Sequence, residues 1–311
     1  MRVHTLEPAR DTLHGLFSRD LPPAITIDSG DTVVLRTLDA GWGMEPPTEP
    51  GATPRRFEDV RPEWKGDGHA LCGPIAVNGA EPGMTLEVRI NDLQPGTWGW
   101  TAGGGPFSAL NKRLGVDDRE EPLQWELDPT RLTARDQHGH TVLLRPFLGV
   151  IGMPPDEPGN HPTSPPRSTG GNLDCKELVV GSSLFLPIAV AGGLLSVGDG
   201  HGAQGDGEAG GTAIECAMER VELTVVVHDN ARLGTPHART PAGWITFGLN
   251  EDLNEAMTAA LDQMLDLMCQ VLAVSRYQAI ALASVAVDLR VTQVANGVWG
   301  IHALLPHGAI R

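Results

Sequence analysis

The stretch from Gly170 to Glu215 constrains the fold more than any other part of this chain. It begins with Gly-Gly-Asn-Leu-Asp, continues through the apolar segment FLPIAVAGGLLSV, and ends in the glycine-rich sequence GDGHGAQGDGE. Glycines let a backbone turn sharply and let loops approach closely. Because an apolar strand pair leads straight into the glycines, we expect a core to hold this loop. The alternative is a solvated, flexible surface loop.

Side chains of the metal-ligand type gather in the same stretch, at Asp199, His201, Asp206, Glu208 and Glu215. Asp199 and His201 are two residues apart, so in an extended segment they point to the same side. Carboxylates and imidazoles that converge on one point repel each other unless a cation or a proton lies between them. A set of His, Asp and Glu suits zinc, whereas an all-oxygen set suits calcium or magnesium. The stretch therefore predicts a metal site.

Composition limits the class of protein. The 311 residues suffice for one large or two ordinary domains with a core. A net charge of −16 disfavours nucleic acid as a partner. The longest apolar run is broken by Pro187 and is too short to span a bilayer, so no membrane partner is expected. The N-terminus lacks an apolar signal segment and the four cysteines lack a CxxC pair, which together predict a cytoplasmic protein with reduced thiols.

Many short strands are predicted, because 38 Gly and 25 Pro accompany only 20% charged residues. Alternating or apolar runs place these strands at 24–27, 32–35, 74–77, 85–93, 123–127, 131–135, 141–144, 146–153 and 215–227. Asp39 follows a strand end and His69 precedes another, so either side chain could reach a site. Residues 41–66 read as a long loop, and Trp98 to Gly105 as a flexible loop that lines a pocket.

The C-terminal part changes character. Helical spacing of apolar residues predicts a helix over 250–271 with Asn250 as its N-cap. A capping box at Ser275 opens a second helix over 277–287, and Asn296-Gly297 makes a tight hairpin turn. The predicted organisation is an N-terminal β domain at 1–145, a central β segment with the site at 146–230, and an α+β part at 231–311.

Several blocks resemble the acetamidase/formamidase family. They are HALCGPIAVNGAEPGMTLEVRI, PFLGVIGMPP, the run from Pro165 to Glu215, and SVAVDLRVTQVANGVWGIHALLP. They cover most of the chain, and the likeness is weakest at 41–66 and 97–145. The resemblance implies a mainly β fold, a jelly-roll-like β-sandwich body with a C-terminal helix–helix–hairpin part. It also implies hydrolysis of short amides such as formamide and acetamide, a bound divalent metal with zinc first and calcium second, and a homo-oligomer.

Site residues carry over from the resemblance by position. The metal or catalytic residues it implies are His69, Asp174, Asp199, His201 and Glu208, with Asp39 and Glu215 as further candidates. In the mechanism that we expect, Asp174 and His201, with His69 or Asp199, hold the metal, and Asp199 and His201 also belong to the catalytic group. Glu208 is the general base. The oxyanion would be bound at Gly170, Gly171 and Asn172, because consecutive glycines form nests of N–H groups.

Other interpretations remain. The main alternative is a non-enzymatic, metal-dependent β protein that binds a small molecule on the same scaffold. A serine amidase is less well supported, because the two serines of Val180–Leu184 lie in a strand pattern. A Cys–Glu–Lys site at Cys175–Glu177 is disfavoured, since adjacent strand residues point to opposite faces. A cupin-like oxygenase would need further histidines near His201.

Overall fold

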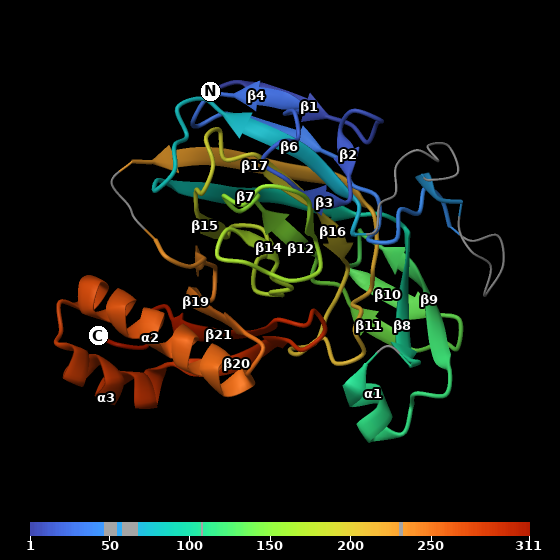
Figure 1. Cartoon of the computed structure of the whole chain (residues 1–311). Helices are drawn as coiled ribbons and strands as arrows, with labels where there is room; N and C mark the ends of the chain where they lie inside the picture. The colour runs from blue at the N-terminus through green and yellow to red at the C-terminus, as the bar shows by residue number, and fades with distance from the viewer. Residues whose placement is uncertain (47–54, 58–67, 107, 230–232) are drawn as a thin grey trace.

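The structure is a computed structural model that describes residues 1–46, 55–57, 68–106, 108–229 and 233–311. Most of its regular structure is β, in two large sheets and two small ones (Figure 1). The largest sheet contains nine strands in the described residues. In order across the sheet they are β1 (Val3–Leu6), β5 (Thr32–Leu35), β17 (Met218–His228), β7 (Thr85–Pro95), β15 (Ser183–Pro187), β18 (His237–Arg239), β19 (Gly243–Asn250), β21 (Trp299–Pro306) and β20 (Asp288–Gln293).

The second large sheet carries the site. In order its strands are β14 (Gly170–Asn172), β12 (Phe147–Gly152), β16 (Leu195–His201), β6 (Leu71–Val77) and β2 (Leu13–His14), with β4 (Ile25–Ile27) paired to β6. Every residue of β6, β12, β14 and β16 is buried. One hydrophobic cluster joins this sheet to the first, with Ile75 and Val197 on one side and Val88 and Val225 on the other. The body is therefore a sandwich.

Two smaller sheets complete the β part. One consists of β11 (Thr141–Leu143), β10 (Thr133–Asp136), β9 (Glu120–Asp128) and β8 (Trp98–Gly104), and the other of β13 (His161–Pro162) and β3 (Leu16–Phe17). The short helix α1 (Ala109–Leu114) lies between β8 and β9, with Ser108 as its N-cap. The segment from Trp98 to Gly105 is thus mostly strand and not the flexible loop predicted, because Trp98 to Gly104 pair with β9 residue by residue.

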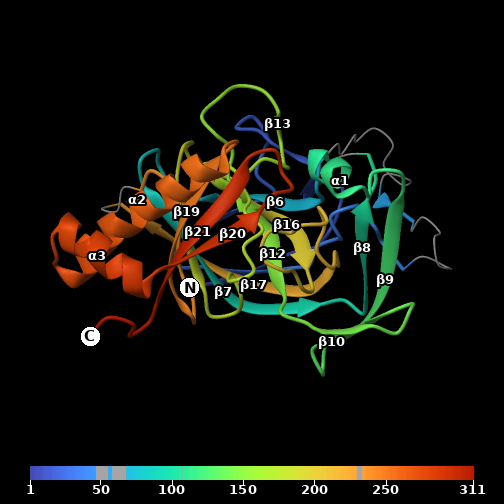
Figure 2. The same cartoon turned by 90° about the horizontal axis from the view of Figure 1, so that it is seen from below.

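The C-terminal part forms the predicted helix–helix–hairpin. Helices α2 (Leu253–Leu272) and α3 (Arg276–Ala286) lie on the side of β19, β20 and β21 (Figure 2). Contact between α2 and β19 is close at Gly248, where an added Cβ would lie 1.8 Å from the carbonyl oxygen of Ala256. The side chains of Ala256, Ala260, Met264 and Met268 are buried in the resulting cluster. Met264 and Met268 are therefore core residues, whereas Met257 of the same helix is exposed.

The mainly β fold class is confirmed, and the capping box at Ser275 is present. Some local predictions were wrong. Asn250 ends β19, and Asp252 caps α2 with hydrogen bonds to Asn254 and Glu255. The apolar segment before the glycine-rich loop forms two strands that do not pair. Instead, β15 lies in the large sheet and β16 in the second, because the turn at Gly192 and Gly193 carries the chain between the layers.

The division into 1–145, 146–230 and 231–311 stays a prediction, although the nine-stranded sheet takes strands from all three parts. The loop predicted at 41–66 lies mostly outside the described residues. Within the described residues, a single helix long and apolar enough to cross a membrane is absent. Helices α2 and α3, bent by 106° to each other, reach that length and apolarity only when taken together.

Candidate functional site

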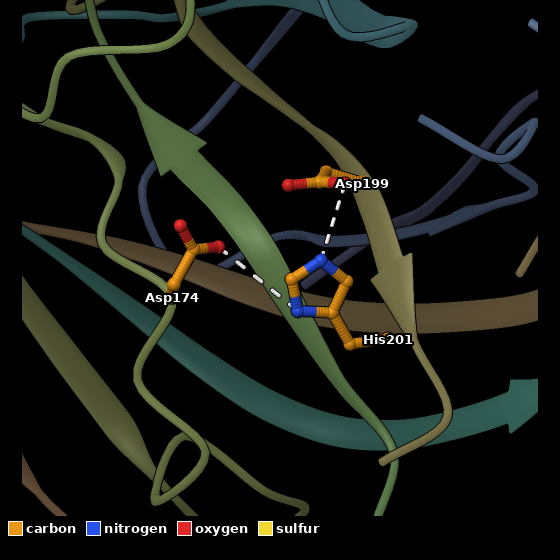
Figure 3. Close-up of side chains that lie close together, drawn as sticks. All are labelled: Asp174, Asp199 and His201. Atoms are coloured by element: carbon orange, nitrogen blue, oxygen red, sulfur yellow. Dashed lines mark ion pairs between the residues drawn. The ribbon is translucent and has the colours of Figure 1, made fainter. Parts of the chain in front are cut away.

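Asp174, Asp199 and His201 converge at the end of the second sheet (Figure 3). Asp199 and His201 lie within β16, and Asp174 follows two residues after β14. Nε2 of His201 lies 3.2 Å from Oδ1 of Asp199, and its Nδ1 lies 4.0 Å from Oδ1 of Asp174. All three residues are at most 2% exposed. The adjacent strand pairing of β12, β14 and β16 therefore brings one imidazole between two carboxylates.

Gly149 of β12 forms the floor of this cluster. A Cβ at this position would lie 2.4 Å from Oδ2 of Asp199, 2.6 Å from Oδ1 of Asp174 and 2.8 Å from Cε1 of His201. Phe147 of the same strand packs edge-on against the imidazole, with ring centroids 4.9 Å apart. The absence of a side chain at 149 leaves room for the three polar groups, and the Phe147 ring fixes the plane of His201.

Glu215 and Glu208 extend the cluster on its other side. Ligand atoms of His201, Glu208 and Glu215 all lie within 4.8 Å of one another, and Oε2 of Glu215 is 3.3 Å from Nε2 of His201. The backbone N–H of Ala213 donates to Oε1 of Glu215 at 2.9 Å. Glu208 is 6% exposed and Glu215 is 3% exposed. Four carboxylates and one imidazole thus share a site that is closed to bulk water.

Three of the four carboxylate residues have a left-handed backbone conformation. The φ angles are +48° at Asp174, +58° at Asp199 and +46° at Glu208. Residues other than glycine adopt this region rarely, and such strain concentrates at functional sites because the surrounding structure must maintain it. Asp199 combines this conformation with a place inside β16. The local backbone is thereby adapted to aim carboxylates at a common point.

Amide side chains orient Asp174 from two directions. Nδ2 of Asn296, in the turn between β20 and β21, donates to Oδ2 of Asp174 at 2.5 Å. The Asn172 amide satisfies its neighbours when its nitrogen donates to Oδ1 of Asp174 at 2.9 Å and to Oδ2 of Asp199 at 3.1 Å. Gln204 donates to the backbone oxygen of Asp174 at 2.9 Å. Such partners fix the direction of carboxylate lone pairs.

Burial and mutual charge shift the pKa values of the cluster. Burial raises the pKa of Asp174 to about 6, and the charge of Asp199 adds to the rise. Burial likewise raises the pKa of Glu215 to about 7, again with Asp199 contributing. Burial, assisted by the charge of Asp174, raises the pKa of Glu208 well above its ordinary value of 4.5. These carboxylates repel one another when no cation other than the imidazole stands among them.

Neighbouring groups of opposite charge shift the pKa values of His201 and Asp199. Burial opposes the charged form of His201, but Glu215 and Asp199 outweigh it, so its pKa lies well above 6.5. Burial also opposes ionisation of Asp199, yet His201 and His69 hold its pKa below the ordinary value. The site therefore stabilises positive charge at its centre.

Unpartnered polar atoms provide a direct test of whether a cation fits. Within the described residues, the buried atoms Asp199 Oδ1, His201 Nδ1, Gln204 Oε1, Glu208 Oε2 and Glu215 Oε2 form no hydrogen bond. Two of these atoms, Asp199 Oδ1 and Glu215 Oε2, share an ion pair with the same Nε2 of His201. A buried polar atom without a hydrogen bond costs about 1–3 kcal/mol, so the set requires an explanation. The donors are carboxylate, imidazole and amide atoms, which are ordinary ligands of divalent cations. The residues fit a bound metal.

The predicted residues divide into a central group and a flanking group. Asp174, Asp199, His201, Glu208 and Glu215 come together, and Asn172 reaches them through its side chain. His69 lies beside the site and bonds Oγ1 of Thr163 at 2.8 Å, but it belongs to neither converging group. Asp206 pairs instead with Lys176 at 3.1 Å.

Asp39 and the glycine pair have other partners. Asp39 accepts from the Gly43 N–H at 2.7 Å and from Nε1 of Trp100 at 3.0 Å, which engages both of its oxygens outside the two groups. The Gly170 N–H donates to the Arg167 carbonyl at 3.0 Å. Gly171 pairs with Ile151 of β12. The N–H of Gly170 is thus already engaged, Asn172 reaches the cluster through its side chain, and the oxyanion role of the three residues stays a prediction.

Sequence reasoning missed Gly149, Asn296 and Gln204. Gly149 appeared only as part of a buried strand, and Asn296 only as a turn former. Nothing local marks either residue, because each reaches Asp174 from a distant segment. Gln204 lies inside the glycine-rich loop, where its amide was a recognisable donor.

The fold and the site together define a class: a β-sandwich with a buried carboxylate–histidine cluster whose residues fit a cation. Within that class, the chain belongs to the acetamidase/formamidase family, whose profile matches residues 3–160 and 158–299. The family resemblance and the expectation of an amidase-type enzyme are confirmed at this level.

Individual proteins similar to this chain agree with the family assignment. A candidate formamidase of Schizosaccharomyces pombe is 30% identical over 285 residues, covering 70% of this chain and 67% of the relative. An acetamidase of Mycolicibacterium smegmatis is 27% identical over 255 residues, covering 63% of this chain and 61% of the relative. The chain thus spans about two thirds or less of these relatives. A solved acetamidase structure from Bacillus halodurans superposes with a TM-score of 0.84 at 27% identity, covering 97% of each chain.

Proposed function

We propose that the chain hydrolyses primary carboxamides to a carboxylate and ammonia with a divalent cation bound among Asp174, Asp199 and His201. The reaction consumes one water, breaks the C–N bond, and transfers protons from water to the leaving nitrogen. The observation that carries the proposal is the set of buried carboxylate and imidazole atoms, on Asp199, His201, Glu208 and Glu215, that converge and form no hydrogen bond. The names of the relatives, acetamidase and formamidase, support short amides as substrates.

Asp174, Asp199 and His201 would hold the cation, with Glu215 completing the set from the other side of the imidazole. A cation so bound lowers the pKa of a coordinated water to about 7 and polarises a carbonyl. The mixed nitrogen and oxygen donors favour zinc over calcium. Asn172 and Asn296 keep the Asp174 carboxylate aimed at the centre.

Glu208 is the proposed general base. Its raised pKa suits a group that accepts a proton from water and returns it to the leaving nitrogen near neutral pH. It is also the least deeply buried carboxylate of the cluster, at 6% exposed. Homo-oligomerisation and a cytoplasmic location remain proposals, which size-exclusion chromatography with light scattering and cell fractionation would test.

The decisive experiment couples metal analysis to turnover. We expect the purified protein to contain stoichiometric divalent metal and to release ammonia from formamide or acetamide. A chelator should abolish release, and added zinc should restore it more fully than calcium. Metal bound without ammonia from any amide would instead support the alternative, a metal-dependent small-molecule-binding protein. Chelator-resistant release from metal-free protein would overturn the metal role.

A further inference from the structure

A pocket of about 290 Å³ lies beside the carboxylate–histidine cluster. Its walls come from β8, from the start of α1, from the segment at 209–212 and from the turn after β20. The residues that give it its character are Trp100, Ala102, Leu110, Ala209, Val294 and Ala295. We call it the β8 pocket.

Residues of the β8 pocket are direct neighbours of site residues. Trp100 and Glu215 exchange two backbone hydrogen bonds, of 3.0 and 2.8 Å. Ala209 follows Glu208 in the chain, and Ala295 precedes Asn296, whose amide bonds Asp174. Glu208, the proposed base, is thus adjacent to the pocket.

Four polar side chains that line the pocket, those of Thr212, Asn111, Ser108 and Trp100, are already engaged. Oγ1 of Thr212 bonds the backbone of Ala102 in both directions, at 2.9 Å each. Asn111 donates to the carbonyl of Gly104 at 2.8 Å, and Oγ of Ser108 caps α1. Nε1 of Trp100 is bound to Asp39. The surface left for a ligand is therefore mostly apolar.

The charge of the lining residues disfavours substrates with a negatively charged acyl group. Among the described residues that line it, none carries a positive charge, and Glu120 contributes a carboxylate. A substrate with a carboxylate in its acyl group would lose hydration and gain no partner. The pocket volume lies near the lower end of the roughly 300–1,000 Å³ that holds drug-sized ligands. That space far exceeds the single methyl group of acetamide.

We propose that the β8 pocket binds the acyl group of the substrate, and that neutral amides with an apolar acyl group larger than acetyl are the preferred substrates. Butyramide, isobutyramide and benzamide are of this class. The inference rests on the proposed amidase function, and it names the substrate class that this site takes. Ala295 is the position chosen for the test, because it lines the pocket without belonging to the cluster.

The test measures kcat/KM for formamide, acetamide, propionamide, butyramide and benzamide with the metal-loaded protein. In the wild type we expect a rise of about fourfold for each methylene beyond acetamide, the gain for burying one CH₂. Ala295→Leu should remove this rise and lower the benzamide value at least tenfold, while formamide changes less than twofold. Ala281→Leu, the same substitution at an exposed position of α3, serves as the control.

Each outcome has a separate meaning. Hydrolysis of formamide and acetamide with a decline toward butyramide and benzamide would overturn the inference and leave the proposed function standing. An equal loss on all amides in Ala295→Leu would also overturn it, because a pocket for the acyl group must discriminate by size. Release of ammonia from none of the five amides would overturn both proposals. Circular dichroism of the variant excludes misfolding as the cause.

Discussion

Nε2 of His201 lies 3.2 Å from Oδ1 of Asp199, and both residues are at most 2% exposed. Glu215, Glu208 and Asp174 complete the surroundings of this pair. Ionised groups are expensive to bury unless they are compensated, so one imidazolium among four carboxylates leaves excess negative charge. The arrangement is consistent with a site whose charge balance is completed by a bound cation. Four predictions follow from the positions of individual residues.

Glu208→Gln should keep the metal and the fold but lower kcat on the order of 10²–10⁴-fold, the usual contribution of a general acid–base group. The amide is of the same size but cannot take a proton from water. Ammonia release and metal content give the measurement. Glu219→Gln is the control, since that side chain is 55% exposed and pairs with Arg36 on the surface. Wild-type kcat in Glu208→Gln would remove Glu208 from the mechanism.

Gly149→Ala should disrupt the site, because residue 149 packs directly against the side chains of the cluster. The added Cβ would clash with Asp199, Asp174 and His201 at 2.4–2.8 Å, so these side chains must move apart. We expect loss of metal binding, together with destabilisation of about 1–3 kcal/mol from overpacking. Gly103→Ala is the matched control, because a Cβ there meets nothing within 4 Å. Equal metal affinity in the two variants, measured by titration calorimetry, would contradict the proposed position of the cation.

Asn296→Ala should weaken metal binding roughly 10–100-fold, the usual effect of losing a hydrogen-bond partner of a ligand. The reason is the 2.5 Å bond from its Nδ2 to Oδ2 of Asp174, which holds that carboxylate in place. Asn91→Ala removes a comparable bond, to Thr224 on the surface, and should leave the affinity unchanged. If the two variants bind metal equally well, Asn296 stabilises the turn between β20 and β21 but does not position Asp174 for the metal.

His14 should make the free energy of unfolding pH-dependent. Burial lowers the pKa of His14 to about 4, and its ring bonds the Leu16 carbonyl and Oγ of Ser196 as a neutral group. The unfolded chain, with a His pKa near 6.5, binds the extra proton first. Stability from neutral His14 is therefore complete above pH 6.5 and is lost as the pH falls toward 4.

Urea unfolding of wild type and His14→Gln at several pH values measures this effect. The stability advantage of the wild type should shrink by about 3 kcal/mol between pH 7 and pH 4, which corresponds to a pKa difference of about 2.5. His302, the other buried histidine with a pKa lowered to about 4 by burial, is present in both proteins and cancels. A constant difference across this range would mean that His14 titrates normally.

Much of the site could be read from the sequence because its ligands are close in the chain. Asp199 and His201 are two residues apart, and Glu208 and Glu215 follow within the same glycine-rich segment. Strand geometry fixes the direction of nearby side chains, so local spacing identifies such a group. The apolar alternation of 85–93 and the capping box at Ser275 were similarly local, and both elements are present.

Predictions from the sequence were wrong where the pairing of a segment with a distant strand decided its structure. Asn250 matched an N-cap by its residue type, but the pairing of β19 with β21 continues to Asn250, so the helix starts later. The segment from Trp98 to Gly105 was rich in glycine, yet its pairing with β9 makes most of it a strand. In both cases, hydrogen bonds to a distant strand outweighed the local preference.

The sequence by itself determined the kind of elements, the family, and the candidate ligands between Asp174 and Glu215. Only the tertiary structure decided which of them meet, that Asp39 and His69 flank the cluster, and that Gly149 and Asn296 shape it. The reason is physical. Side-chain direction along one strand follows from backbone geometry, whereas the approach of β12, β16 and the β20–β21 turn depends on strand pairing and on the burial of a shared core.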